Sequence, residues 1–210
     1  VLFYGQGPNR WKYDSTGIPA FKHIMNLYSD STFYFINVDQ PLTTKAKRID
    51  QQFSTTQPFT HAVTSFDDYA FHENDNQNLI NSGNQWFGEF YDNISSYDFS
   101  FNFPFIEPTP ATVKVNMAAR NDEVSLFSAS CQSGTATLSV LPVNFGSYEY
   151  AQTSSTYFNF NPTNPVVTVN VTKQTVGALG WLDYVEVNVR RKLTMSGDQL
   201  IFRDANSVGS

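Results

Sequence analysis

Three separate stretches alternate strictly between apolar and polar residues, and this alternation limits the fold more than any other feature of the sequence. Residues 97–103 carry an aromatic side chain at every odd position, and residues 112–117 and 167–172 repeat the pattern with valine or methionine. A period of two puts successive side chains on opposite faces of a strand, so each stretch predicts a strand with one buried face. Strands of parallel sheets are covered on both faces and read as continuous apolar runs. The pattern therefore predicts antiparallel sheets that pack face to face.

Turn-forming residues separate the predicted strands. They are Asn121-Asp122, Gln132-Ser133-Gly134, the run Asn161–Pro165 and Ser196-Gly197-Asp198. Breaks at intervals of about ten residues or more are typical of β-sandwiches and jelly rolls. The sequence has no alternation of strand and helix patterns and no internal repeat. We therefore predict an all-β fold, an antiparallel β-sandwich of jelly-roll type.

The chain of 210 residues is long enough for one large β domain. We expect a single non-catalytic domain over 1–210, with its most regular strands in 97–204. Residues 1–75 are less regular, and we expect them to form strands and loops wrapped into the sandwich. Within this part, the aromatic run Thr32–Ile36 has apolar side chains at both parities, which predicts a central strand.

One segment carries a helical pattern, and it is short. Near Glu73–Ser82, Asp75 could serve as the N-cap, Leu79 and Ile80 would face inward, and Gly83 would end the helix. We expect one short helix here, followed by aromatic residues that pack over an open end or side of the sandwich.

Composition argues against several function classes. Thirteen Lys and Arg against nineteen Asp and Glu give a net charge of −6, so the chain has no cationic surplus for a run of phosphates. Nucleic acid is therefore not an expected partner. A single cysteine excludes an internal disulfide and a multi-cysteine zinc site. No apolar run reaches the length needed to span a bilayer, and no cofactor-binding motif is present. We expect no cofactor.

Cys131 is the one candidate for a nucleophile, and a cysteine nucleophile needs a histidine to accept its proton. His23, His61 and His72 all lie in the N-terminal third of the sequence, far from Cys131 along the chain. We expect Cys131 to be a structural residue and assign no catalytic residue.

Four acidic residues, Asp67, Asp68, Glu73 and Asp75, lie within nine positions. Paired carboxylates can divide acid and base roles in hydrolysis, and carboxylate oxygens can bind calcium. Both alternatives stay open, but carboxylates next to a turn and a helix start are more often caps and solvated charges. We favour the structural interpretation and expect no metal ligand.

Asp183 is the most unusual single charge. In the run Trp181–Val189 it has the same parity as the apolar residues, which predicts an inward-pointing carboxylate. A buried carboxylate without a partner costs several kcal/mol, so it needs backbone amides or an arginine such as Arg190, Arg191 or Arg203. We expect a structural latch between Asp183 and these groups.

Three groups of residues, taken together and in order, resemble a known family. They are residues 1–8 with 11–14, residues 78–83 leading into 86–90, and residues 181–184 followed by Arg190-Arg191 and Phe202-Arg203. This set resembles the region ahead of the peptidase domain in the PorU family, the gingipain-like sortases of the bacterial type IX secretion system. The stretch His23–Ile36 fits as well. Asn84 departs from the pattern, because the family would have a basic residue at this position.

The resemblance implies an extracytoplasmic multidomain protein at the outer-membrane surface of a Gram-negative bacterium. In this family a cysteine peptidase domain follows the segment, removes the C-terminal signal from secreted cargo and attaches the cargo to surface lipopolysaccharide. The catalytic Cys and His belong to that later domain, so the resemblance assigns no catalytic residue here. It implies a structural and docking domain whose partners are the adjoining peptidase domain and a secreted cargo polypeptide or a surface glycan.

A carbohydrate-binding jelly-roll module is the alternative. The three tryptophans, Trp11, Trp86 and Trp181, are candidates for ligand or interdomain contacts. A tryptophan in an open cleft beside polar side chains would favour glycan binding, whereas burial of all three would favour a scaffold.

Overall fold

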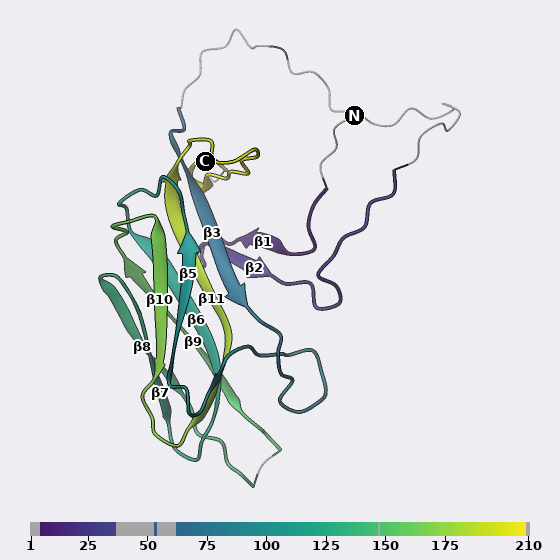
Figure 1. Cartoon of the computed structure of the whole chain (residues 1–210), viewed down its shortest axis with the longest axis vertical. Helices are drawn as coiled ribbons and strands as arrows, with labels where there is room; N and C mark the ends of the chain where they lie inside the picture. The colour runs from purple at the N-terminus through teal and green to yellow at the C-terminus, as the bar shows by residue number, and fades with distance from the viewer. Residues whose placement is uncertain (1–4, 37–52, 54–61, 147, 209–210) are drawn as a thin grey trace.

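The computed structural model describes residues 5–36, 53, 62–146 and 148–208, and eight of its strands form a two-layer sandwich (Figure 1). These strands are β3 (Ser65–Glu73), β5 (Ser96–Asn102), β6 (Ala111–Arg120), β7 (Ser125–Cys131), β8 (Gly134–Val140), β9 (Gln152–Phe160), β10 (Val166–Lys173) and β11 (Leu179–Lys192). The two sheets have the orders β5-β10-β7-β8 and β3-β11-β6-β9, and every pair is antiparallel. Counted from β3 without β4, the orders are 2-7-4-5 and 1-8-3-6, the connectivity of a jelly roll. The predicted all-β antiparallel sandwich is confirmed.

The alternating stretches supply the core between the sheets. In β5 and just after it, Phe99, Phe101 and Phe103 point inward, and the valines of β6 and β10 at the predicted positions are fully buried. Each large side chain removed from water contributes roughly 1.5–3 kcal/mol. The apolar side chains that recur at every second position therefore stabilise the sandwich.

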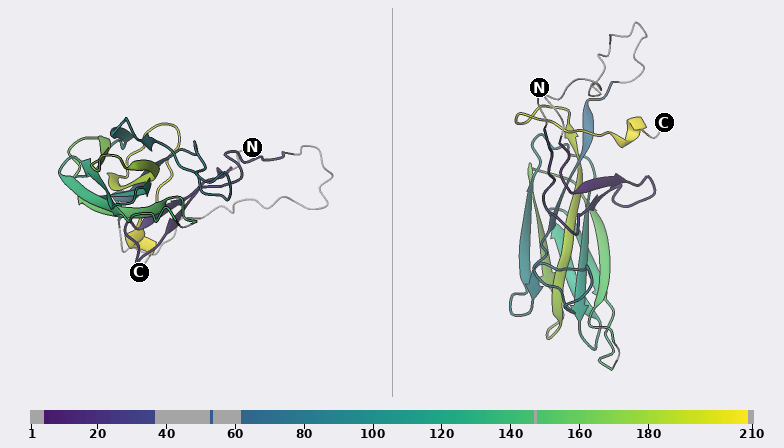
Figure 2. Two further views of the ribbon diagram at one scale, coloured as in Figure 1. Left: turned by 90° about the horizontal axis from the view of Figure 1, so that it is seen from below. Right: turned by 90° about the vertical axis from the view of Figure 1, so that its right-hand side faces the viewer.

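A third layer lies on the outer face of the sheet that contains β3 and β11. It is the hairpin of β1 (Arg10–Tyr13) and β2 (Phe21–Ile24), which Figure 2 shows standing beside the sandwich. The short strand β4 (Phe90–Tyr91) pairs with the first residues of β11.

Two local predictions are wrong, the helix near Glu73–Ser82 and the central strand at Thr32–Ile36. The segment expected to be helical continues β3 to Glu73 and then forms a loop, and the helix α1 lies at Ala205–Val208. The side chain of Asn78 is the reason, because its Oδ1 accepts hydrogen bonds from the amides of Ile80 and Ser82 and so competes with helical pairing. No described helix has the length and apolarity to cross a membrane.

The aromatic run at Thr32–Ile36 is not part of any described strand, so the predicted central strand is not formed there, and the Tyr34 hydroxyl donates to the Gln6 carbonyl at 2.6 Å. Phe33 and Phe35 are 79% and 98% exposed. A strand that is apolar on both faces needs a covering layer on each side, and none of the described residues forms one.

Candidate functional site

The hairpin is held on the sheet by side chains of β11 that bind the backbone of β2. Asn188 accepts from the Phe21 amide through Oδ1 at 3.2 Å and donates to the Phe21 carbonyl through Nδ2 at 3.1 Å. Two positions along β11, Glu186 Oε1 accepts from the His23 amide at 2.6 Å. The side chains of Glu186 and Asn188, two residues apart in β11, therefore bind backbone groups of β2 in the way that a neighbouring strand would.

A charged cluster lies under the hairpin. The two ring nitrogens of His23 face two carboxylates, Nδ1 to Glu186 Oε1 and Nε2 to Glu73 Oε2. Burial opposes the charged imidazolium, but hydrogen bonds to Glu186 and Glu73 and their charges outweigh it and raise the pKa of His23 to about 9. At neutral pH the ring is protonated and donates to both carboxylates. Glu186 is only 1% exposed, so the positive charge of the His23 imidazolium compensates the negative charge of a buried carboxylate.

Aromatic rings surround this cluster and keep water away from it. Phe71 stacks on the imidazole with a centroid distance of 4.4 Å, and Tyr184 meets it edge-on at 4.7 Å. Trp11 lies against Tyr69 at 4.0 Å and is half-buried in this contact. Trp11 therefore belongs to the hairpin's apolar contact with the sheet.

Asp183 does not pair with the arginines expected of it. The register of β11 against β6 shifts between Leu182 and Tyr184, and this β-bulge removes the inward orientation that parity predicts. The Asp183 carboxylate instead accepts from Asn116 Nδ2 at 2.7 Å. Burial, and next the charge of Glu73, raise its pKa to about 6.

Replacing Asp183 by asparagine should therefore stabilise the fold at pH 7. A carboxyl group whose folded pKa lies above its unfolded value of 3.8 destabilises the fold as pH rises through about 6, and the amide keeps the acceptor for Asn116 without the charge. We expect the free energy of unfolding to rise by about 1 kcal/mol. This is less than the full pKa shift would give, because water screens this half-buried carboxylate. Urea unfolding at pH 7 and pH 4 measures it. A gain of equal size at both pH values, or a loss at pH 7, would contradict the prediction.

The arginines bind the acidic residues at the start of β3. Arg190 donates to Asp67 at 3.0 Å and to Asp204 at 2.7 Å, and Arg191 donates to Asp68 at 2.6 Å. The acidic cluster of the sequence is thus divided, with two members bound to arginines at one end of β3 and Glu73 bound to His23 at the other. Among the described residues no group of three or more His, Cys, Asp or Glu is placed to hold a metal ion.

Cys131 lies in the core, where it is 2% exposed, and burial raises the pKa of its thiol to about 11. The described histidines bind elsewhere, His23 to its two glutamates and His72 to Glu89 at 2.8 Å. His61 lies outside the described residues. This environment is that of a structural thiol.

The Cys131 thiol should accordingly resist a disulfide reagent such as DTNB in the native protein at pH 8 and react fully once the chain is unfolded in urea. Reaction requires an accessible thiolate, and burial removes both accessibility and thiolate character. Stoichiometric labelling of the native protein within seconds would show that the thiol is open to solvent.

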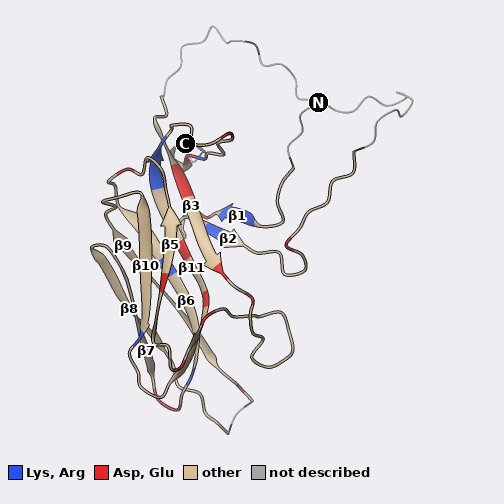
Figure 3. Ribbon diagram, in the orientation of Figure 1, with Lys and Arg blue, Asp and Glu red and all other residues tan. Residues whose placement is uncertain are grey.

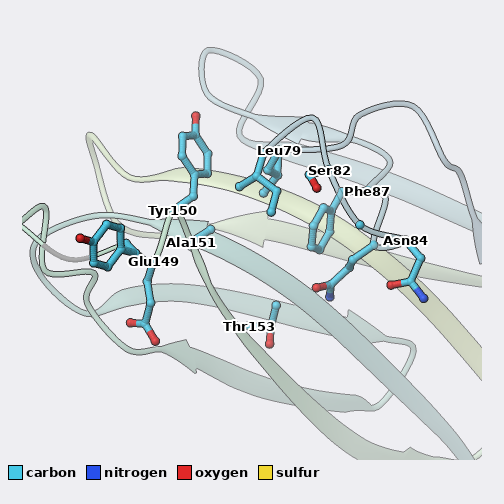
Figure 4. A pocket seen from close by; sticks show the side chains of 12 residues that line it. Leu79, Ser82, Asn84, Phe87, Glu149, Tyr150, Ala151 and Thr153 are labelled. Atoms are coloured by element: carbon cyan, nitrogen blue, oxygen red, sulfur yellow. The ribbon is translucent and has the colours of Figure 1, made fainter.

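An open groove lies between the loop after β3 and the segment before β9, and Figure 4 shows part of it. Leu79 and Phe87 of the loop lie on one side, and Tyr150 and Ala151 on the other. This cavity of about 380 Å³ adjoins a second of about 620 Å³ that Trp86 lines. We call the two together the amide groove, because asparagine and glutamine dominate the loop, residues 76–87, which carries no charged residue (Figure 3).

The three candidate tryptophans have different surroundings. Trp86 is 43% exposed in the amide groove beside polar side chains, whereas Trp181 is 2% exposed beneath the loop. Trp181 Nε1 donates to Gln77 Oε1 at 3.2 Å, and its ring stacks on Phe90. Exposure therefore separates Trp86 from the other two tryptophans, a distinction that strand parity alone could not make.

No protein-family model and no curated protein matches the sequence. Among solved structures, the chain is similar to dimeric latent PorU from Porphyromonas gingivalis, with a TM-score of 0.73 and 17% identity. The match covers 97% of this chain and 20% of the PorU chain. A CBM35 from Cellvibrio japonicus Abf62 gives a TM-score of 0.36 at 15% identity, over 68% of this chain and 95% of the other, too low to support an argument. The chain thus has a PorU-like jelly-roll fold and spans about a fifth of the length of PorU.

Proposed function

We propose that this chain is a non-catalytic structural and docking domain of a PorU-like cell-surface peptidase of the gingipain type, involved in type IX secretion and in the processing of C-terminal signals. The observation that carries the proposal is the similarity to PorU over 97% of the chain and only 20% of PorU. This coverage is the relation expected between one domain and a multidomain protein. The corresponding location is the outer-membrane surface of a Gram-negative bacterium.

The mechanism would be positional, with a rigid sandwich that holds a neighbouring peptidase domain and offers a surface to secreted cargo. An apolar cavity of about 410 Å³ suits such a contact. It lies between the hairpin, which contributes Tyr13 and Phe21, and the C-terminal segment, which contributes Phe202. Arg190 fixes that segment through Asp204, so this surface is pre-organised for docking.

Two measurements test the proposal. The 210-residue chain alone should not turn over an unstructured fluorogenic peptide, and it should bind the remainder of its parent protein, supplied as a separate polypeptide, in a calorimetric titration. Turnover that Cys131→Ala abolishes would overturn the non-catalytic assignment, and absence of binding would overturn the docking role. Phe202→Ser should weaken this binding, whereas Ile94→Ser, which changes a similarly exposed side chain elsewhere, should not.

A second candidate, a carbohydrate-binding module, is favoured by one specific observation. Trp86 stands exposed in a cleft lined by polar side chains, which is the arrangement expected for sugar binding. Docking at the apolar cavity and sugar binding at the amide groove use different residues, so one chain could serve both purposes.

A further inference from the structure

The amide groove has a chemical character that restricts what can bind there. Among the described lining residues Glu149 is the one charged side chain, and Gln152 Nε2 donates to its carboxylate at 2.6 Å. In the part of the chain that the structure describes, no lysine or arginine lines the groove to neutralise a phosphate, a sulfate or an acidic sugar. The groove therefore favours a neutral ligand.

Side-chain amides at the groove are available for a ligand. The side-chain amides of Asn76, Asn81 and Asn84 make no hydrogen bond to any described residue, whereas the side chain of Asn78 shapes the loop. Each free amide offers two donors and an acceptor, so it can donate to one hydroxyl group and accept from its neighbour. Such pairs of adjacent hydroxyl groups are the repeating polar feature of a sugar ring.

Aromatic rings supply the apolar part of the surface. Trp86 and Tyr150 are about two-fifths exposed and line the same cavity. The face of an aromatic ring carries partial negative charge, and the C–H groups on one face of a pyranose carry partial positive charge, so the two flat surfaces stack. A groove that pairs free amides with exposed rings therefore matches the two surfaces of a sugar.

The groove is pre-organised. The amides of Asn76 and Gln77 donate to the Phe87 carbonyl, and the Phe87 amide donates back to Gln77, each at 2.9 Å. On the opposite side the guanidinium of Arg120 lies over the Tyr150 ring at 4.4 Å and donates to the Tyr150 carbonyl at 2.6 Å. A surface fixed before binding loses less conformational entropy when a ligand arrives. This self-pairing of the loop also occupies backbone groups that an added peptide strand would need.

We infer that the amide groove binds a neutral oligosaccharide, with Trp86 stacking on a sugar ring and Asn76, Asn81 and Asn84 binding its hydroxyl groups. Cavities of about 380 and 620 Å³ fall within the range of small-ligand sites. The inference rests on the second candidate function and deepens it by naming the site and the ligand class. It does not depend on docking at the apolar cavity.

The test is a calorimetric titration of the 210-residue chain with neutral hexasaccharides of glucose, mannose, galactose and xylose. We expect saturable binding of at least one of them, weakened about tenfold or more by Trp86→Ala. Tyr28→Ala is the matched control, because it removes a ring that is 92% exposed outside the groove, and it should leave binding unchanged. Asn84→Ala should weaken binding to the same hexasaccharide without loss of stability.

Three results would overturn the inference: no saturable binding of any of the four hexasaccharides, equal binding by the Trp86→Ala variant, or preferential binding of an acidic oligosaccharide such as hexagalacturonate. Failure here is distinguishable from failure of the docking role. Binding of the parent protein's remainder, measured with the Trp86→Ala variant, should be unaffected in either case.

Discussion

Replacing His23 by alanine is expected to release the N-terminal hairpin from the sheet. The change leaves Glu186 buried without its imidazolium, and removing one partner of a buried ion pair costs about 3 kcal/mol or more. The amides of β2 should then exchange with solvent on the order of a hundredfold faster, a factor that corresponds to nearly 3 kcal/mol. Hydrogen exchange followed by mass spectrometry, together with urea unfolding, measures both quantities.

Lys22→Ala is the matched control, because Lys22 belongs to the same strand and forms an ion pair with Asp14 that is open to solvent. Exposed pairs contribute little, so hairpin protection should hardly change. Adding Glu186→Gln to the His23→Ala variant should recover part of the loss, since it removes the uncompensated charge. Unchanged exchange in the His23→Ala variant would show that the cluster does not hold the hairpin.

The contribution of His23 should also depend on pH. A histidine whose pKa rises from 6.5 to about 9 on folding stabilises the fold fully below pH 6.5 and loses this contribution as pH rises through about 9. The difference in hairpin protection between the parent chain and the His23→Ala variant should therefore narrow between pH 7 and pH 10. A constant difference over this range would mean that the charge on His23 is not involved.

The sandwich was predictable because its strands obey a local rule. The period of two at residues 97–103, 112–117 and 167–172 determines which side chains face the core, and turn residues mark the ends. The spacing of these signals is typical of a jelly roll or a related sandwich, and the observed strand order is that of a jelly roll. The long strand β11 obeys the rule from Val185 onward, where its valines face inward.

The parts that sequence reasoning missed depend on contacts between distant residues. Glu73 and Glu186 lie 50 and 163 positions from His23, and no local pattern links them. The bulge next to Asp183 moved its carboxylate out of the predicted orientation through one added residue, which leaves no clear trace in composition. The loop after β3 carries helix-end signals, Asp75 as a candidate N-cap and Gly83 as a terminator, but the side chain of Asn78 favours a turn between them.

The tryptophans illustrate the same limit, because the sequence identified all three but could not rank them by exposure. Trp181 is one of the candidates for ligand or interdomain contacts, yet the loop after β3 covers it through Phe87 and Gln77. Trp86 is part of the loop that covers Trp181, so its own side chain remains exposed to solvent. Whether an aromatic side chain is core or surface is decided here by a segment about a hundred residues away.

Replacing Trp181 by alanine should for this reason destabilise the protein strongly. The ring is 2% exposed, stacks on Phe90 at 5.3 Å and packs against Phe87 and Ala118, so its removal opens a large cavity. Such substitutions cost about 3–5 kcal/mol, and the Gln77 acceptor also loses its donor. Urea unfolding followed by circular dichroism measures the loss without relying on tryptophan emission.

Trp86→Ala provides the matched comparison, since it removes the same side chain from a half-open position and should change the free energy of unfolding by less than about 1 kcal/mol. Trp181→Phe should fall between the two, because it keeps most of the packing and removes the hydrogen bond to Gln77. Equal losses for the two alanine variants would mean that the loop does not distinguish a buried ring from an exposed one. The assignment of Trp86 as the ligand-facing residue would then lose its physical basis, because that assignment depends on the loop packing against a buried Trp181.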